Sequence, residues 1–313
     1  MELTIATGDY AHTRGLAPQV QIRVDGETAA VHHVVDSPVA IFRRALAEDP
    51  PFDVAEMSLA TAHVLANRGD VRFVALPVFP SRMFRHSAFY VRDDIARPEQ
   101  LRGRRIGVIR YGMTAAVWAR ALLQEAHGLA PADLEWWIGE PQFFAPRGID
   151  LHVTEGRAGL ERMLLDGELD CLFSVDEPAA FKEGRIRRLF PEFAATEREH
   201  YRRTGIFPIM HTLLIKRALI DAYPALPSAL LAVFEAAKRA AQAWVSDTDH
   251  SSLPIPFQHG WASDVSTLFG ADPWPYGLAA NRPVLERFAE LMHAQGLTER
   301  RLRPEEVFLP LEP

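Results

Sequence analysis

Short apolar runs alternate with helix-type patterns from the first residues onward, and this alternation is the strongest constraint on the fold. Apolar and β-branched runs predict strands at residues 3–7, 31–35, 52–57 and 73–79. Pro80 is predicted to end the last of these strands. Ser37 and Pro38 are typical of a helix start, and a second helix is predicted from residue 58 to about residue 68. This alternation predicts an α/β fold with a mostly parallel sheet.

A second set of such elements follows a polar, turn-rich stretch at residues 97–103. Strands are predicted at residues 105–109, 134–138 and 170–174, and helices at residues 113–127 and 159–166. An apolar stretch at residues 206–215 then leads into long helices predicted at residues 224–245 and 283–295. A length of 313 residues predicts about two domains. The two sets therefore predict two α/β lobes with a central cleft between them.

Composition excludes several classes of protein. The 34 Lys and Arg against 41 Asp and Glu give a net charge of −7, which argues against a general nucleic-acid or anionic-membrane surface. The single cysteine, Cys171, rules out an internal disulfide and a cysteine-based zinc cluster. No apolar run approaches the roughly 20 residues of a membrane span. The N-terminus lacks a signal-peptide pattern, so we expect a cytoplasmic protein without nucleic-acid or membrane partners.

The densest group of candidate functional residues lies just after the strand predicted at residues 73–79. Arg82, Arg85, His86 and Ser87 fall in one short segment there. Ligands of open α/β sheets bind beyond the carboxyl ends of strands. Two arginines fit a substrate with two carboxylates, and the histidine can transfer a proton near neutral pH. A solvated turn with a surface histidine is an equally weighted interpretation.

Two carboxylates also stand at the ends of predicted strands, Asp9 just after one and Glu56 near the end of another. Asp9 and Glu56 can each act as a general base or hold a substrate hydroxyl, and Ser58 adds a hydroxyl close to Glu56. For Asp9, simple turn chemistry after Gly8 is the commoner explanation. Glu56 is the stronger candidate, because a carboxylate buried at a strand end needs a partner.

Tyr111 and Thr114 stand at the start of the helix predicted at residues 113–127. Free backbone amides at a helix N-terminus attract anions, and Thr114 adds a hydroxyl. Helix capping is an equally weighted interpretation. Both residues are therefore candidate substrate-binding residues.

The sequence does not favour a metal or a nucleotide. The His-Glu-x-x-His motif is absent, and His32 and His33 point to opposite faces of a predicted strand. Neither a P-loop nor a G-x-G-x-x-G pattern occurs. Cys171 lies in an apolar run, where an inert thiol is expected. We therefore expect no metal site and no cofactor site.

Several stretches together resemble the 4,5-dihydroxyphthalate decarboxylase family. They are residues 77–88 (PVFPSRMFRHSA), 52–58 (FDVAEMS), 113–118 (MTAAVW), 201–212 (YRRTGIFPIMHT) and 274–278 (WPYGL). The family is similar in fold to type II periplasmic solute-binding proteins. The resemblance implies a discontinuous lobe 1 at residues 1–91 and 207–313 and an inserted lobe 2 at residues 92–206. The crossings would fall near residues 87–92 and 206–212, which would place His86 and His211 close to the hinge and the cleft.

The resemblance also implies the reaction. The family removes one carboxylate from 4,5-dihydroxyphthalate without oxidation and forms protocatechuate, as part of phthalate catabolism. Direct loss of carbon dioxide would leave a strongly basic aryl carbanion. If the hydroxyl para to the departing carboxylate is deprotonated, the ring carbon can instead accept a proton first, and carbon dioxide then leaves as aromaticity returns. This route requires no organic cofactor and no redox metal.

The roles that this chemistry needs can be assigned as hypotheses. Arg82 and Arg85 would anchor the carboxylates. His86 is the first candidate for the acid that protonates carbon, and His211 is the second. Glu56 or Asp9 would hold the catechol hydroxyls.

Two alternatives stay open at this stage. One is a solute-binding protein for a small aromatic carboxylate that feeds a transporter. The other is an enzyme of the same fold that acts on a different hydroxylated aromatic acid. In each case the expected partner is a small aromatic carboxylate. The sequence leaves the oligomeric state open, a homo-oligomer included.

Overall fold

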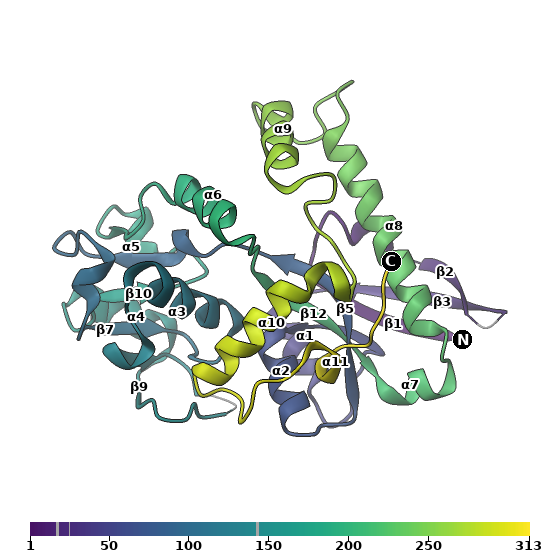
Figure 1. The fold of residues 1–313 in the computed structure, drawn as a ribbon, viewed down its shortest axis with the longest axis horizontal. Helices are drawn as coiled ribbons and strands as arrows, with labels where there is room; N and C mark the ends of the chain where they lie inside the picture. Colours follow the sequence, from purple (N-terminus) through teal and green to yellow (C-terminus); the bar gives the residue numbers. More distant parts are fainter. Residues whose placement is uncertain (17–18, 25, 142–143) are drawn as a thin grey trace. The chain divides into compact units, whose positions relative to one another are not determined.

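The computed structural model describes residues 1–16, 19–24, 26–141 and 144–313 of the chain (Figure 1). The chain divides into two compact units. Unit 1 comprises Met1–Arg82, Ile209–Glu286 and Arg303–Pro313. Unit 2 comprises Met83–Pro208 and Arg287–Leu302. Each unit has its own sheet.

The described residues of unit 1 form a six-stranded sheet in the order β2-β3-β1-β4-β12-β5. Its strands are β1 (Glu2–Thr7), β2 (Gln19–Val24), β3 (Glu27–Val35), β4 (Val54–Ser58), β5 (Phe73–Arg82) and β12 (Ile209–Lys216). The strand β1 runs parallel to both β3 and β4, as the alternation of strands and helices predicts. In contrast, β12 lies antiparallel to β4 and β5, and β2 lies antiparallel to β3. The sheet of unit 1 is therefore mixed. The strands β1, β3, β4 and β5 share one direction, as predicted, whereas β2 and β12 run in the opposite direction.

The strand β5 also runs further than predicted. It continues through Pro80 to Arg82 instead of ending at the proline. Proline has no N–H to donate, but an edge strand tolerates it. Because β5 is at the end of the strand order, the strand can carry Pro80 and bring Arg82 into the unit 1 sheet.

Local sequence signals explain the first helices of unit 1. The Ser37 side chain caps α1 (Pro38–Ala45) by accepting a hydrogen bond from the Ala40 N–H at 3.4 Å. The helix α2 (Leu59–Asn67) ends before Gly69, whose φ of +70° suits glycine. The remaining helices of the unit are η1 (Arg14–Leu16), α7 (Arg217–Ala222), α8 (Leu226–Ser246), α9 (Gln258–Phe269) and α11 (Pro304–Val307). The helix α10 (Leu278–Ala294) starts in unit 1 and ends in unit 2.

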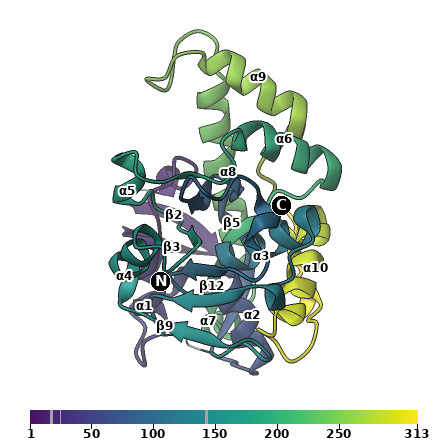
Figure 2. The same ribbon diagram turned by 90° about the vertical axis from the view of Figure 1, so that its left-hand side faces the viewer.

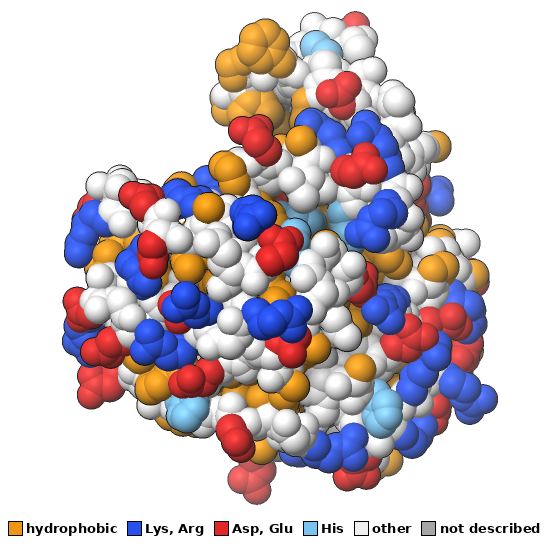
Figure 3. Space-filling model, turned by 60° about the vertical axis from the view of Figure 1, so that its left-hand side comes forward, with side chains coloured by type: hydrophobic (Ala, Val, Ile, Leu, Met, Phe, Trp, Pro, Cys, Tyr) orange, Lys and Arg blue, Asp and Glu red, His pale blue; other side chains and the backbone are white. Residues whose placement is uncertain are grey.

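Within unit 1, α9 and the C-terminal half of α8 project away from the sheet, as both ribbon views show (Figures 1 and 2). Four large apolar side chains of this segment are exposed, namely Trp244, Ile255, Phe257 and Trp261. The space-filling view shows hydrophobic side chains at the tip of this projection (Figure 3). The projecting segment therefore exposes several large apolar side chains to solvent.

The described residues of unit 2 form a six-stranded sheet in the order β11-β6-β10-β7-β8-β9. Its strands are β6 (Phe89–Val91), β7 (Arg105–Val108), β8 (Glu135–Ile138), β9 (Leu151–Val153), β10 (Cys171–Phe173) and β11 (Arg187–Arg188). The neighbouring strands β10, β7, β8 and β9 run parallel to one another. The strand β6 pairs antiparallel with both β10 and β11. Its helices are η2 (His86–Ala88), η3 (Pro98–Leu101), α3 (Thr114–His127), η4 (Pro131–Asp133), α4 (Gly156–Leu165), α5 (Ala179–Lys182) and α6 (Phe193–Thr204).

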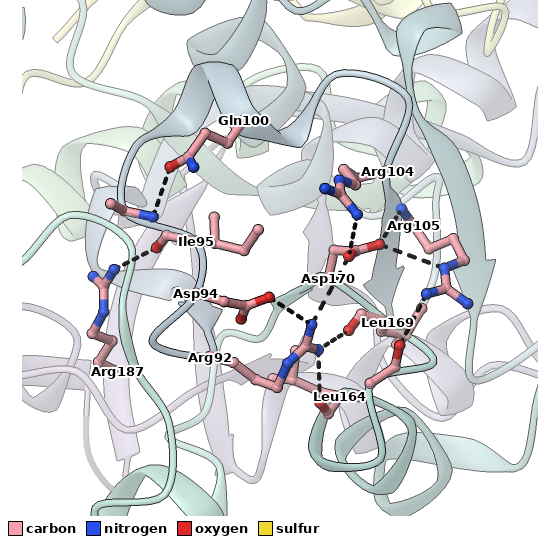
Figure 4. A network of polar contacts seen from close by, with 12 residues as sticks. Arg92, Asp94, Ile95, Gln100, Arg104, Arg105, Leu164, Leu169, Asp170 and Arg187 are labelled. Carbon is pink, nitrogen blue, oxygen red and sulfur yellow. Dashed lines mark hydrogen bonds and ion pairs between the residues drawn. The ribbon is translucent and has the colours of Figure 1, made fainter.

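A buried carboxylate ties one end of the unit 2 sheet together. Asp170, just before β10, is 3% exposed and accepts hydrogen bonds from Arg105 N at 3.0 Å and from Arg104 Nη1 at 3.4 Å (Figure 4). Nearby, Arg92 Nη1 donates to the carbonyl oxygens of Leu164 and Leu169. These arginine contacts satisfy backbone and carboxylate oxygens that the fold would otherwise bury without partners.

The unit boundaries differ from the lobe boundaries expected at residues 91–92 and 206–207. The first division falls between Arg82 and Met83, because β5 ends in the first sheet and the next strand, β6, pairs in the second. Residues 287–302 also group with unit 2, whereas the family resemblance implies that they belong to lobe 1. None of the helices in the described parts of the chain is both long and apolar enough to cross a membrane.

Candidate functional site

A buried glutamate and a histidine on neighbouring strands form the central feature of unit 1. Glu56 lies on β4 and His211 lies on β12, and His211 Nδ1 is 2.5 Å from Glu56 Oε1. In the register of the two strands, Leu213 is directly opposite Glu56. His211 is two residues before Leu213 and therefore lies on the same face, as a diagonal neighbour of Glu56. The sheet itself thus brings the two side chains together.

The carboxylate of Glu56 has two further hydrogen-bond donors, both just after β1. The Gly8 N–H donates to Oε2 at 2.6 Å, and the Tyr10 hydroxyl donates to Oε1 at 2.6 Å. A Cβ at position 8 would lie 2.8 Å from Tyr10 Cε2, so a side chain there would displace the Tyr10 ring from its present place. The Glu56 side chain is 0% exposed. Its oxygens are therefore engaged by the protein and are not turned to solvent.

The charge state of Glu56 follows from these contacts. Burial raises the pKa of its carboxyl group, but the hydrogen bond and charge of His211 and the hydrogen bonds from Tyr10 and Gly8 lower it more. The net pKa lies below its ordinary value, which favours the carboxylate form. An ionised Glu56 fixes the orientation of His211 and leaves Nε2 as the ring nitrogen for proton exchange.

The backbone at His211 is irregular. The pairing of β12 with β5 shifts register on both sides of His211. Such bulges re-aim a side chain and occur often next to active sites. The His211 side chain is 19% exposed, and its ring meets the Phe42 ring edge-on at 5.0 Å. Among the candidate residues of unit 1, His211 therefore has a side chain that is partly accessible to solvent and a ring that is held in a fixed orientation.

A second aromatic group adjoins Tyr10. His12 stacks on Tyr10 at 5.4 Å, contacts Trp274 at 5.3 Å and shares a hydrogen bond with the Pro80 carbonyl oxygen at 2.9 Å. Burial lowers the pKa of His12. His12 and Trp274 line a cavity of about 310 Å³ that also borders α8 and α9. Tyr10 thus connects Glu56 with the wall of this cavity.

The other predicted residues of unit 1 lie in different settings. The Asp9 side chain is 61% exposed and pairs with Arg14 at 3.0 Å, and this arginine lowers the pKa of Asp9. Ser58 is half-buried at the end of β4, directly opposite His211. Arg82 is 4% exposed, and its Nη2 donates to the Pro275 carbonyl oxygen at 2.9 Å and to Asn281 Oδ1. The structure thus brings Glu56, Ser58 and His211 together, whereas Asp9 faces solvent and Arg82 is bound within unit 1.

In unit 2, His86 belongs to a small cluster with residues of α6. Its Nδ1 lies 3.7 Å from Glu197 Oε1, and its ring lies 5.5 Å from the His200 ring. His86 is 3% exposed and also contacts Phe190 edge-on. Burial, reinforced by the nearby His86 and Arg203, lowers the pKa of His200 to about 4. His200 is therefore neutral at pH 7.

Arg85 and Ser87 flank His86, and both are half-buried. Arg85 Nη1 lies 3.1 Å from Met83 Sδ. The Ser87 carbonyl oxygen accepts a hydrogen bond from Arg188 Nε at 3.1 Å. Arg85 and Arg82, which are close in sequence, thus fall in different units of the fold.

Tyr111 and Thr114 are both buried at the start of α3. The Tyr111 ring packs edge-on against Trp136 at 5.4 Å and lies under the guanidinium group of Arg120. Sequence reasoning gave Arg120 no role, because nothing in a helical pattern marks one arginine as buried. The sequence places Tyr10 just after a predicted strand, where ligands of α/β sheets bind, but nothing in the sequence assigned it a role.

No group of three or more His, Cys, Asp or Glu side chains in the described ranges is arranged to hold a metal ion. Cys171 is buried on β10, and burial raises the pKa of its thiol. His33 is buried and His32 is exposed, so the two point to opposite faces of β3, as the strand period predicts.

Comparison with known proteins identifies the family. No protein-family model matches the chain. Over 99% of its length the chain is 37% identical to the 4,5-dihydroxyphthalate decarboxylase of Comamonas testosteroni, and it covers 97% of that protein. The chain belongs to the 4,5-dihydroxyphthalate decarboxylase family. The decarboxylase of the same name from Pseudomonas putida is 32% identical over 63% of this chain and 81% of its own length.

Solved structures show the fold of this family member. The periplasmic aliphatic sulphonate binding protein SsuA from Escherichia coli has a TM-score of 0.53 at 15% identity, covering 100% of this chain and 93% of its own. The desulfurization enzyme DSZB has a TM-score of 0.54 at 16% identity, with 99% and 96% covered. A Candida albicans protein described as having the generic periplasmic binding protein fold has a TM-score of 0.53 at 11% identity, with 100% and 97% covered. The expected two-lobed α/β fold like that of periplasmic binding proteins is confirmed.

Proposed function

We propose that this protein is a carboxy-lyase that converts 4,5-dihydroxyphthalate to protocatechuate and carbon dioxide without oxidation. The observation that carries this proposal is the similarity to a curated decarboxylase of that name, which extends over almost the whole of both chains. A small hydroxylated aromatic dicarboxylate is then the substrate.

The reaction needs a group that delivers a proton to carbon. Deprotonation of the hydroxyl para to the departing carboxylate makes the ring carbon that bears this carboxylate electron-rich. That carbon accepts a proton, the bond to the carboxylate breaks, and its electron pair restores the aromatic ring as carbon dioxide leaves. A histidine that is oriented by a carboxylate suits such proton transfer near neutral pH.

His211 is our principal candidate for this acid. Its Nδ1 is held by Glu56, so the proton would be exchanged at Nε2. Glu56 acts as a positioning residue and does not hold the catechol hydroxyls, since Gly8, Tyr10 and His211 already engage its oxygens. His86 is the second candidate, because it is more deeply buried than His211 and its nearest carboxylate is at 3.7 Å.

Arg85 is our candidate for anchoring a substrate carboxylate, with the hydroxyls of Ser58, Ser87 and Thr114 as additional substrate contacts. The guanidinium of Arg82 is engaged by Asn281 and Pro275, so we assign Arg82 a structural role. Asp9, which pairs with Arg14, is not retained as a catalytic residue.

The location and assembly of the protein are also proposals. We propose that it works in the cytoplasm, where cell fractionation with a periplasmic marker would test its location. Light scattering of the purified protein would decide between a monomer and a homo-oligomer.

A solute-binding protein for a small aromatic carboxylate is the second candidate function. The likeness in fold to SsuA favours this alternative. The equally close likeness to the desulfurization enzyme DSZB indicates that the fold also serves enzymes. The fold alone therefore does not separate the two functions.

One assay separates them. Purified protein is incubated with 4,5-dihydroxyphthalate, and protocatechuate and carbon dioxide are measured with a chelator, with an added divalent metal and with neither. Release of equal amounts of both products supports the decarboxylase. Tight binding without turnover in all conditions would support the binding protein, and activity that a chelator abolishes would contradict the expectation of no metal.

The same assay ranks the two histidines. His211→Gln is expected to lose turnover while it still binds substrate, because glutamine cannot transfer a proton. His86→Gln should retain most of the activity. The reverse pattern would make His86 the acid.

A further inference from the structure

Arg120 is a buried cation in the interior of unit 2. It lies on α3 and is 1% exposed. Its Nε donates to Gln295 Oε1 at 2.7 Å, and Gln295 Nε2 in turn donates to the Val117 carbonyl oxygen at 3.0 Å. These two bonds fix the plane of the guanidinium group.

The guanidinium group of Arg120 lies over aromatic rings. Its central carbon is 3.6 Å from the centre of the Tyr111 ring and 5.5 Å from the centre of the Trp136 ring. Helical side chains lean toward the N-terminus of their helix, so Arg120 reaches back over Tyr111, which precedes α3. The charged group is thus held at the N-terminal end of α3.

Three hydrogen-bond donor atoms around Arg120 have no acceptor among the described residues. Nη1 and Nη2 of Arg120 and the hydroxyl of Tyr111 are all buried and form no hydrogen bond with any residue that the structure describes. Burial lowers the pKa of Arg120 to about 10. No carboxylate in the described parts of the chain pairs with Arg120, so its charge is buried without a counterion. Such a charge is costly unless an anion or hydrogen-bond acceptors compensate it.

We propose that Arg120 and Tyr111 form a buried binding site for a carboxylate group. The two Nη atoms form the fork that matches two carboxylate oxygens, and the Tyr111 hydroxyl supplies a third donor. The carboxylate belongs either to a small free acid or to the ring of an aromatic acid. Binding of an aromatic acid rests on the proposed decarboxylase function, whereas binding of a small free acid does not.

The test measures binding without turnover. The thermal unfolding temperature is followed as acetate or phthalate is titrated in at constant ionic strength. A ligand that binds only the folded state raises this temperature in a concentration-dependent way. The unmodified protein should show a saturable rise, and Arg120→Met should lose it.

Arg287→Met is the matched control. Arg287 is also an arginine of unit 2, but its guanidinium pairs with Glu125 and Glu290 and is 37% exposed. This variant should keep the saturable response to carboxylate. Tyr111→Phe removes one oxygen and should weaken the apparent affinity by about tenfold, as expected for one hydrogen bond to a charged group.

The outcomes are decisive in either direction. An equal response of the unmodified protein and Arg120→Met, or no saturable response at all, would overturn the site. If Arg120→Met does not fold, Tyr111→Phe carries the test, and an unchanged affinity in that variant would overturn the site. A response to phthalate but not to acetate identifies the ring carboxylate as the source, and a response to both identifies the carboxylate group alone. Because turnover is not measured, a protein without decarboxylase activity can still have this site.

Discussion

His211 and Glu56 form a hydrogen-bonded pair, with 2.5 Å between Nδ1 and Oε1, although 155 residues separate them in the chain. The glutamate is completely buried and the histidine is partly exposed. A buried carboxylate that holds one ring nitrogen leaves the other free to exchange a proton, which is the arrangement of a general acid–base histidine. The pair therefore gives the decarboxylase proposal its most direct structural test.

Replacement of Glu56 by Gln should lower kcat by about 100-fold, because the carboxylate of Glu56 holds the His211 ring in its orientation through Nδ1. Substrate affinity should change little, since Glu56 is engaged within the protein. Steady-state kinetics with 4,5-dihydroxyphthalate measure both quantities. Glu48→Gln, at an exposed position after α1, is the control. A normal kcat in Glu56→Gln would exclude the pair from the reaction.

Replacement of Tyr10 by Phe should move the acidic limb of the pH–activity profile to higher pH. The Tyr10 hydroxyl lowers the pKa of Glu56, so its removal raises that pKa and the carboxylate form requires a higher pH. The ring that stacks on His12 is retained. The profile of kcat/KM against pH measures the shift, and Tyr223→Phe serves as the control. An unmoved limb would show that the hydroxyl does not tune the pair.

Replacement of Arg82 by Ala should destabilise the protein by about 2 kcal/mol, because Asn281 Oδ1 loses a charged donor in a buried setting. Arg85→Ala, at a half-buried position three residues further on, should have a much smaller effect on stability. Urea unfolding of the two variants gives the comparison. Equal stability of the two would contradict the structural role of Arg82.

Stability should fall as the pH is lowered from about 6.5 to about 4, in part because of His63. Burial lowers the pKa of His63 to about 4, so the unfolded chain binds a proton in this range that the folded protein does not. The contribution of neutral His63 to the free energy of unfolding is therefore complete above pH 6.5 and is lost as the pH falls toward 4. Urea midpoints over this range should depend less on pH in His63→Gln. A parallel pH dependence in both proteins would show that His63 is not the cause.

Much of the fold follows from local sequence. The apolar runs at β1 and β4 and the capping signals at Ser37 and Gly69 predict their elements, because strand period and capping depend on neighbouring residues. The family also follows from sequence, since its motifs are spread over the chain. The antiparallel direction of β12 does not follow from the sequence, because the residues of a strand do not specify which other strands it pairs with.

The candidate site divides in the same way. The sequence by itself determined that Glu56 stands at the end of an apolar run and that Arg82 and Arg85 lie close together after the apolar run at residues 73–79. Only the tertiary structure decided that Glu56 binds His211, that Asp9 turns to solvent and that Arg82 is held by Asn281. It also decided that Arg120 is buried without a counterion among the residues that the structure describes. The physical reason is that burial and pairing depend on segments brought together from distant parts of the chain, whereas a sequence pattern reports only its own surroundings.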